Sequence, residues 1–392
     1  MLNFETLKSK HNDNIMPSYS RFDVALVSGK GAVAVDCGGR EYVDFTSGIG
    51  VNSLGYCDDK WVSAVSGQAA ALQHISNLYY NPVSTELAAK LCELTGLDKV
   101  FFGNSGAEAN ECAIKLARKY SNDKYGDNSK RNEIVTLQNS FHGRTVTTLA
   151  ATGQDHFHEH FYPFTEGFSY AQTNMESIKS TVSEKTCAVL IELIQGEGGV
   201  CPLDKAFVQD LRAFCTEKDI LLMIDEVQTG VGRTGALYCY QNYGIQPDVI
   251  TSAKGLGGGL PIGACLCRKG LGEVLNSGMH GSTFGANPVV CAGALAVLDR
   301  VAKPEFLAEV QAKGEYIRCK LSKMKNVDFV RGMGLMLGIG LKTGTAKEAA
   351  AACAKNGLLI LTAKDLLRML PPLTIRYEEI DKGLAILEQV IG

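Results

Sequence analysis

Residues 220–235, ILLMIDEVQTGVGRTG, decide the fold of this chain. They open with a short apolar run, typical of a buried strand, that ends in the polar residue Asp225. Residues 248–264, DVITSAKGLGGGLPIGA, repeat this arrangement and place Lys254 after the strand. Short apolar strands that alternate with helices predict an α/β fold, in which helices cover both faces of a mainly parallel sheet.

The same alternation extends through the middle of the chain. Further strands are predicted at KVFFGN, NEIVTLQ and CAVLIEL, and helices at STELAAKLCELTG and AEANECAIKLARKY. Earlier residues form short β-like runs with turn glycines, whereas the C-terminal third mixes helices and strands. We therefore expect an N-terminal segment (residues 1–55) that is part of a small domain, a large domain (residues 56–285), and a C-terminal small domain (residues 286–392).

Composition argues against several classes of protein. The 392 residues carry a net charge of −3, which gives no electrostatic footprint for nucleic acid. The N-terminus is polar and no apolar stretch reaches roughly 18 residues, so we expect neither a signal peptide nor a membrane span. The 13 cysteines include no CxxC pair, which favours reduced thiols, a cytoplasmic protein and no metal site.

Residues 103–119, GNSGAEANECAIKLARK, combine a strand end with a helix start near Gly106. The free N–H groups and the positive dipole end of such a helix can hold a phosphate. Ser105, Gly106 and Ala107 have small side chains that would not block the approach. Taken alone, such a segment is more often an ordinary capped helix.

Residues 140–145, SFHGRT, follow another predicted strand. The ring of Phe141 could stack on a planar cofactor, or simply pack in the core. Arg144 could bind a carboxylate with both arms of its guanidinium group, or form a surface ion pair.

Asp225 and Lys254 lie at the carboxyl ends of strands, where ligands bind in parallel α/β sheets. A carboxylate at the position of Asp225 could keep a ring nitrogen protonated. The competing interpretation is a metal-binding carboxylate, but the chain has no GxxxxGK[ST] loop to support it. A partly desolvated Lys254 could form a Schiff base, whereas a lone lysine is usually solvated.

Together these segments resemble the class III aminotransferases of pyridoxal 5′-phosphate (PLP) fold type I. The motifs that carry the resemblance are GNSGAEANECAIKLARK, FHGRT, IQGEGGV, MIDEVQTGVGRTG and AKGLGGGLPIGA. The resemblance runs from YSRFDVALVSGKGAVAVD to LRMLPPLTI, nearly the whole chain. It implies a large PLP-binding domain with a mainly parallel, seven-stranded sheet, and a smaller α+β domain.

The resemblance also implies how the cofactor is held. Lys254 would form a covalent aldimine with PLP, Asp225 would pair with the pyridinium nitrogen, and Gln228 would contact the phenolic oxygen. Thr283, in GSTFGAN, would reach the phosphate in the neighbouring subunit, which implies a homodimer with shared active sites. The expected cofactor-binding residues are Ser105, Gly106, Ala107, Phe141, Asp225, Glu226, Val227, Gln228, Lys254 and Thr283.

Within the family, SNLYYN, GIGVNSLG, FHGRT and RMLPPLTI most resemble the acetylornithine aminotransferases. This similarity implies that Arg144 binds the α-carboxylate of the acylated substrate, with Ser282 of the other subunit and Tyr19 nearby. It further implies that Arg376 binds the α-carboxylate of glutamate and 2-oxoglutarate. Glu197, in QGEGG, would pair with Arg376 when no substrate carboxylate is present.

The activity implied by the resemblance is transfer of the δ-amino group of N2-acetyl-L-ornithine to 2-oxoglutarate, in arginine biosynthesis. The products would be N-acetyl-L-glutamate 5-semialdehyde and L-glutamate. Ornithine, succinylornithine, 4-aminobutyrate and succinyl-diaminopimelate remain alternative donors. A racemase, an aminomutase, a decarboxylase and a non-catalytic PLP-binding protein are alternatives of other classes. Two departures from the family pattern, Leu193 and a short loop before Arg368, are expected to lie near the substrate arm.

Overall fold

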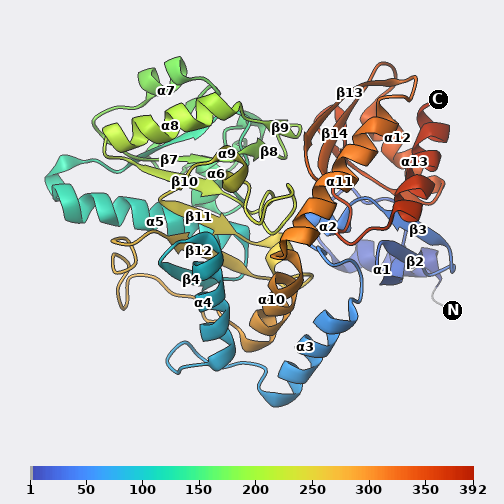
Figure 1. Ribbon diagram of the computed structural model, residues 1–392, viewed down its shortest axis with the longest axis horizontal. Helices are drawn as coiled ribbons and strands as arrows, with labels where there is room; N and C mark the ends of the chain where they lie inside the picture. Colours follow the sequence, from blue (N-terminus) through green and yellow to red (C-terminus); the bar gives the residue numbers. More distant parts are fainter. Residues whose placement is uncertain (1–2) are drawn as a thin grey trace.

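The large part of the molecule is built on one seven-stranded sheet, seen edge-on in Figure 1. A computed structural model describes residues 3–392. Only β12 runs antiparallel to its two neighbours, so the predicted mainly parallel α/β sheet is confirmed. In spatial order the strands are β4 (Lys99–Gly103), β12 (Gly263–Cys267), β11 (Val249–Ser252), β10 (Leu221–Asp225), β7 (Thr186–Ile191), β5 (Glu133–Leu137) and β6 (Phe168–Ala171).

Helices bury both faces of this sheet, because successive residues of a strand point to opposite sides. In β10, Leu222 and Ile224 belong to one apolar core and Leu221 and Met223 to the other. All four side chains are buried. The helices of this part are α3 (Asp59–Ala71), α4 (Pro82–Thr95), α5 (Gly106–Tyr125), α6 (Val146–Ala151), α7 (Met175–Thr181), α8 (Lys205–Glu217), α9 (Tyr240–Tyr243) and α10 (Pro288–Val301).

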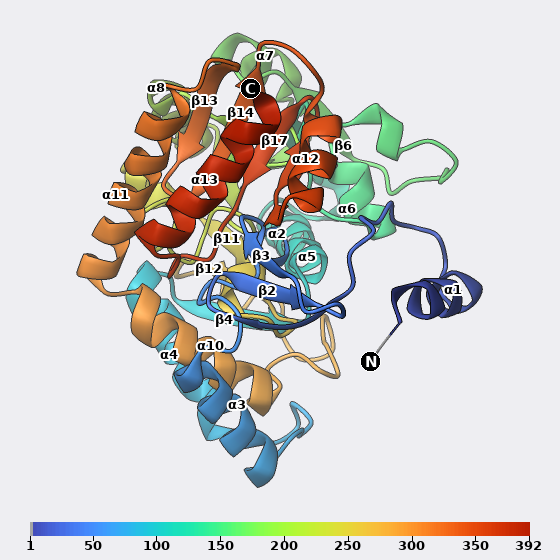
Figure 2. The same ribbon diagram turned by 90° about the vertical axis from the view of Figure 1, so that its right-hand side faces the viewer.

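A second, antiparallel sheet forms the C-terminal part of the molecule. Its helices α11 (Pro304–Leu321), α12 (Ala346–Lys355) and α13 (Tyr377–Ile391) flank the strands, as Figure 2 shows. In spatial order the strands are β13 (Val327–Met333), β14 (Met336–Leu341), β17 (Leu366–Met369) and β16 (Leu361–Ala363).

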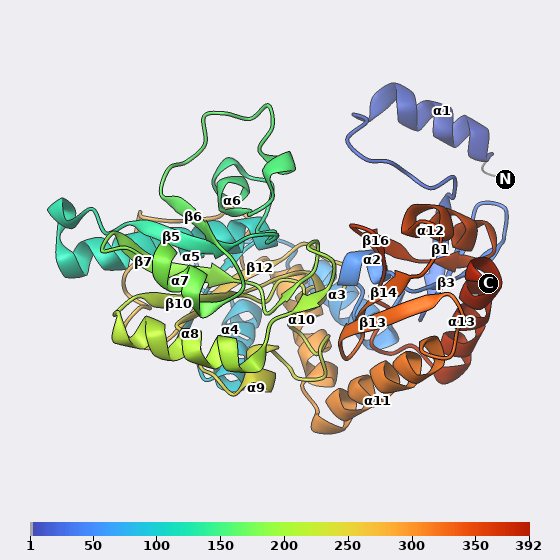
Figure 3. The same cartoon turned by 90° about the horizontal axis from the view of Figure 1, so that it is seen from above.

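The N-terminal strands join this C-terminal part through a third sheet. Strand β3 pairs in parallel with β15, where Val43 faces Leu358 and Asp44 faces Leu359. The sheet consists of β1 (Leu26–Lys30), β2 (Val33–Asp36), β3 (Glu41–Asp44) and β15 (Leu358–Leu359). Seen from above, helix α1 (Phe4–Asn14) stands apart from the rest of the chain, and short α2 (Ser47–Gly50) follows β3 (Figure 3).

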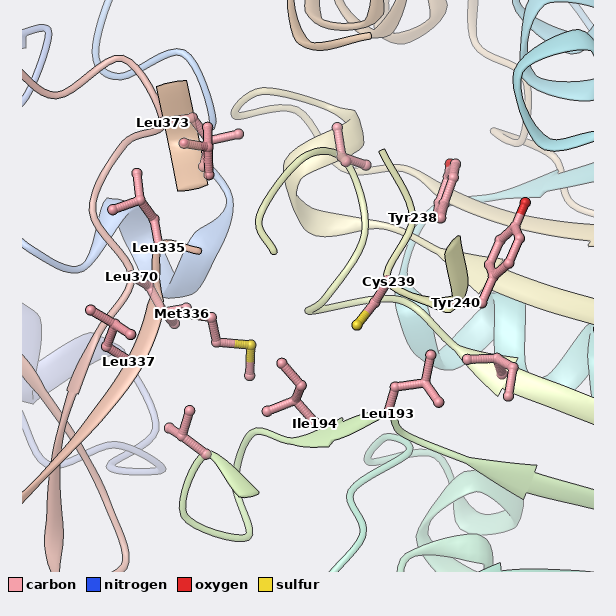
Figure 4. Close-up of a cluster of buried hydrophobic side chains, with 14 of the residues drawn as sticks. Leu193, Ile194, Tyr238, Cys239, Tyr240, Leu335, Met336, Leu337, Leu370 and Leu373 are labelled. Carbon is pink, nitrogen blue, oxygen red and sulfur yellow. The ribbon is translucent and has the colours of Figure 1, made fainter. Parts of the chain in front are cut away.

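An apolar cluster joins the large part to the C-terminal part (Figure 4). Ile194 faces Met336 across it, Leu193 lies towards Cys239 and Tyr240, and the side chains of Leu193, Ile194 and Met336 are fully buried. Leu193 was expected near the substrate arm. Its side chain lies in this core, and its carbonyl accepts hydrogen bonds from Tyr243 Oη (3.1 Å) and Leu203 N (2.9 Å).

No helix in residues 3–392 combines the length and the apolar character needed to cross a membrane.

Candidate active site

A cavity of about 640 Å³ opens at the carboxyl ends of β10 and β11. This is the edge of a parallel sheet at which α/β proteins bind their ligands. Ten of the residues expected from the sequence line it: Tyr19, Ser105, Gly106, Ala107, Phe141, Arg144, Asp225, Val227, Gln228 and Lys254.

Lys254 enters the cavity from a single turn of 3₁₀-helix just after β11. Its backbone is left-handed, with φ of 41°, a conformation that costs energy in a non-glycine residue. Burial lowers the pKa of the Lys254 ammonium, while the Glu197 carboxylate acts in the opposite direction. A lowered pKa increases the fraction of neutral amine, which is the nucleophilic form.

Asp225, the last residue of β10, is only 4% exposed and is held by three hydrogen-bond donors. Its Oδ2 lies 2.8 Å from both Asn110 Nδ2 and His142 Nδ1, and its Oδ1 accepts the N–H of Val227 at 3.0 Å. These contacts fix the plane of the carboxylate. Asn110 and His142 were not among the residues predicted from the sequence, although both lie inside the motifs GNSGAEANECAIKLARK and SFHGRT.

The N-terminus of the 20-residue helix α5 forms one wall of the cavity. The Ser105 hydroxyl caps Glu108 N at 3.1 Å, and the Ser105 carbonyl accepts from Ala109 N at 3.0 Å. Among residues 3–392 no protein acceptor faces the N–H groups of Gly106 and Ala107. Two free N–H groups at the positive end of a long helix suit a phosphate.

Glycine is required at position 106 because the backbone there lies very close to the side chain of Val227. A Cβ on Gly106 would lie 2.7 Å from Val227 Cγ1, a distance at which side chains cannot coexist. The glycine therefore lets the helix N-terminus and the segment after Asp225 border the same cavity.

The remaining wall fits a planar, polar ring. The Oε1 atom of Gln228 is buried without a hydrogen-bond partner in residues 3–392, so it can accept from a ligand. The half-buried ring of Phe141 is an aromatic surface on which such a ring could stack. Together with Asp225, Lys254 and the free N–H groups of α5, Gln228 and Phe141 provide the kinds of contact that the expected PLP would need.

Arg144 lies in the cavity wall with an exposed side chain. Its guanidinium carbon lies 4.1 Å from the centre of the Phe157 ring and 5.5 Å from that of Phe141. In residues 3–392 it forms no ion pair, so it can take an incoming carboxylate. Tyr19, 75% exposed, also lines the cavity.

The expected pairing of Glu197 with Arg376 is wrong. Arg376 is the N-cap of α13, its side chain is 70% exposed, and it pairs with Glu379 at 2.9 Å. The partner of Glu197 is Arg368 on β17, whose Nη1 lies 2.7 Å from Glu197 Oε1. The Arg368 side chain is only 4% exposed, and its Nε has no partner in the described part of the chain.

Three other expected residues lie outside the cavity wall. Thr283 is exposed, and the half-buried Ser282 accepts a hydrogen bond from Asn104 Nδ2 at 3.0 Å in its own chain. Glu226 points away from the cavity, because its carboxylate accepts from Thr229 Oγ1 (2.5 Å) and Tyr240 N (2.8 Å). The structure therefore does not bring Glu226 to the cofactor position.

Glu192 was also not predicted from the sequence, but it lines the cavity and is 5% exposed. Its carboxylate accepts from Phe141 N at 2.8 Å and from Gly196 N at 3.2 Å. Burial raises the pKa of Glu192 to about 7. This carboxylate ties the stacking residue to the loop that carries Glu197.

The described residues contain no cluster of three or more His, Cys, Asp or Glu side chains that could bind a metal ion. All 13 cysteines have free thiols.

Comparison with known proteins adds to this geometry. Residues 15–391 match the family model described as aminotransferase class-III. An acetylornithine aminotransferase of Haemophilus ducreyi is 50% identical over 99% of both chains. A succinylornithine transaminase of Photorhabdus laumondii is 45% identical over 96% of both. The crystal structure of an ornithine aminotransferase from Toxoplasma gondii has a TM-score of 0.94 at 28% identity and covers 100% of this chain and 95% of that one.

Glu226 should make stability depend on pH. Burial raises the pKa of Glu226 to about 7, whereas it is about 4.3 in an unfolded chain. The unfolded state therefore releases its proton first, and the free energy of unfolding falls as pH rises between these values, by about 4 kcal/mol. Glu226→Gln should gain stability relative to the wild type over this interval, measured by urea unfolding at pH 5 and pH 8.

The exposed Glu388 supplies the control, because Glu388→Gln should change stability equally at both pH values. A Glu226→Gln difference that is identical at pH 5 and pH 8 would contradict the assignment.

Proposed function

The chain belongs to the class III aminotransferases, and from that membership we propose that it transfers the δ-amino group of N2-acetyl-L-ornithine to 2-oxoglutarate. The products are N-acetyl-L-glutamate 5-semialdehyde and L-glutamate, and the reaction serves arginine biosynthesis. The observation that carries this proposal is the presence of two arginines in different electrostatic states. Arg144 is a free cation in the cavity wall, and Arg368 is neutralised by Glu197.

The two substrates need these two states. Acetylornithine presents its carboxylate at the far end from the reacting amine, where Arg144 can hold it. Glutamate presents a carboxylate next to the reacting amine, and that carboxylate can displace Glu197 from Arg368. When the acylated substrate is bound, the Glu197–Arg368 pair avoids a bare buried cation, which would be costly.

Bound PLP supplies the electron sink that stabilises the carbanion left when a proton leaves the substrate carbon. Asp225 would hold the ring nitrogen in its protonated form, because hydrogen bonds from His142 and Asn110 fix its carboxylate. Gly106 and Ala107 would hold the phosphate through their N–H groups, and Gln228 would contact the ring. We assign the covalent link to the cofactor to Lys254.

Lys254 then serves as the proton carrier of the reaction. Its amine is within the cavity, and burial lowers its pKa toward the range in which it can both accept and donate a proton. Its amine would accept the proton that leaves the substrate carbon and, once protonated, would act as the proton donor.

We further propose a cytoplasmic homodimer in which each subunit completes the other's site. Asn77 Nδ2 donates to the carbonyls of Ser282 (3.1 Å) and Gly285 (3.0 Å), so the segment around residue 80 lies beside Thr283. This surface exposes large apolar side chains, as a protein interface does. They are Leu78 (88% exposed), Tyr79 (69%), Tyr80 (103%) and Phe284 (62%).

A comparison of amino donors tests the substrate. Acetylornithine should have the highest kcat/KM among acetylornithine, ornithine, succinylornithine, 4-aminobutyrate and succinyl-diaminopimelate, with 2-oxoglutarate as acceptor. A donor that exceeded it by more than tenfold, about 1.4 kcal/mol, would contradict the proposal. Without 2-oxoglutarate, one aldehyde should be released per site; a racemase or a decarboxylase would release none.

Borohydride reduction tests the role of Lys254. Reduction of the holoenzyme should fix the cofactor mass on the peptide that contains Lys254. Lys254→Ala should leave every peptide unmodified and lower kcat at least 100-fold, about the contribution of a positioned acid–base group. The exposed Lys269 gives the control, since Lys269→Ala should keep the label and the rate.

Sedimentation tests the dimer. Tyr80→Glu places a charge in the exposed aromatic surface and should weaken association at least tenfold, with activity falling in proportion to the dimer lost. Ser180→Glu adds the same charge on exposed α7 and should leave a dimer. A monomeric wild type with full activity would disprove shared sites.

A further inference from the structure

The loop that carries Glu197 is held at both of its ends. It connects the short strands β8 (Ile194–Gln195) and β9 (Cys201–Pro202). At its start, Gly196 N donates to Glu192 Oε2 at 3.2 Å. At its end, the Gly199 carbonyl accepts two hydrogen bonds from one guanidinium group, from Arg331 Nε at 2.9 Å and Nη2 at 2.7 Å.

Arg331 and Arg368 belong to one row across the C-terminal sheet. Arg331 on β13 pairs with Gly338 on β14, and Gly338 pairs with Arg368 on β17. Residues that face each other across neighbouring strands project from the same side of the sheet. The two arginines therefore flank a glycine on the face that meets the loop, two strand spacings or about 10 Å apart at their backbones.

Gly338 leaves room for the loop between the two arginines. A Cβ at this position would lie 3.0 Å from Val200 Cβ and 3.4 Å from the Gly199 carbonyl oxygen. Gly199 is equally constrained, because its φ is +105° and a Cβ would lie 2.9 Å from Arg331 Nη2. The loop backbone therefore packs directly against Gly338 and its two flanking arginines. Arg331 binds the backbone of the loop, and Arg368 binds the Glu197 side chain.

The two arginines hold different parts of the loop, because Arg331 binds its backbone and Arg368 binds the Glu197 side chain. When a substrate carboxylate takes Arg368, the Glu197 side chain must leave, and afterwards it must return to the same place. A fixed Gly199 carbonyl confines this exchange to the side chain, because the backbone of the loop stays attached to β13. Arg331 binds the Gly199 carbonyl and not the Glu197 side chain, so any effect it has on Arg368 passes through the loop that carries Glu197.

We propose that Arg331 is a positioning residue that sets the preference between acylated ω-amine donors and glutamate. The proposal rests on the function proposed above and adds a residue to it. Without the anchor, Glu197 covers Arg368 in a smaller fraction of molecules. The acylated donor then meets a bare guanidinium, while glutamate meets less competition for it.

Single-turnover half-reactions test this proposal. In Arg331→Met the ratio of kcat/KM for acetylornithine to that for glutamate should fall at least fivefold. Arg331→Lys keeps the charge but lacks the planar fork, so it should give an intermediate ratio. A ratio that stays at the wild-type value while both rates fall together would mean a purely structural role and would overturn the proposal.

Arg318 provides a matched control. It also binds two carbonyls beside β13, those of Val330 at 2.7 Å and Gly332 at 3.0 Å, but not the Glu197 loop. Arg318→Met should keep the ratio within twofold of the wild type, and an equal fall would overturn the proposal. In a Glu197→Ala background, Arg331→Met should cause no further change in the ratio, because residues that act through one another are not additive.

Hydrogen exchange gives a readout that needs no substrate. Amides of residues 194–202 should exchange at least tenfold faster in Arg331→Met than in the wild type or in Arg318→Met. Unchanged exchange would overturn the proposed anchor whichever donor the enzyme prefers. A wild-type enzyme that fails to use acetylornithine, with exchange accelerated as expected, would instead contradict the proposed function alone.

Discussion

The buried carboxylate of Asp225 is the constraint on which the site depends. It ends a strand whose five residues are all buried, and its hydrogen-bond partners come from α5 and from the segment after β5. A carboxylate in such a place is tolerated only when it is fully hydrogen-bonded. This requirement fixes the positions of Asn110 and His142. It therefore also fixes the N-terminus of α5 at Gly106, on the same helix as Asn110, and the ring of Phe141, next to His142.

Much of this arrangement could be predicted from the sequence, because it follows from strand ends. Asp225, Lys254 and Gly106 each stand directly beside an apolar strand, and the carboxyl ends of parallel strands meet at one edge. Strand β12 was harder to predict, since GACLC directly follows a glycine-rich bend and reverses the direction of the chain. The five residues of β12 carry no sequence pattern that distinguishes an antiparallel strand from a parallel one.

The errors arose where a role depends on which side of a short element a residue faces. Arg368 and Arg376 lie eight residues apart and both follow apolar residues, but Arg368 is on a strand facing the loop, whereas Arg376 is the N-cap of α13 and its side chain is exposed. Glu226 is adjacent to Asp225, and the alternation of a strand turns it to the opposite side. Leu193 lies in the core between the large part and the C-terminal part of the molecule, and the spacing of residues in the sequence does not reveal that these two parts are in contact.

The pairing of β3 with β15 affects the order in which the chain can fold during synthesis. Strand β3 is complete by residue 44, but its neighbour consists of residues 358 and 359. A ribosome must add more than three hundred residues before one edge of β3 can be covered. Throughout that time the growing chain exposes a strand edge whose residues are mostly buried in the folded protein, and such an edge can pair with other chains. The large sheet, whose strands all lie between residues 99 and 267, can form meanwhile without either terminus.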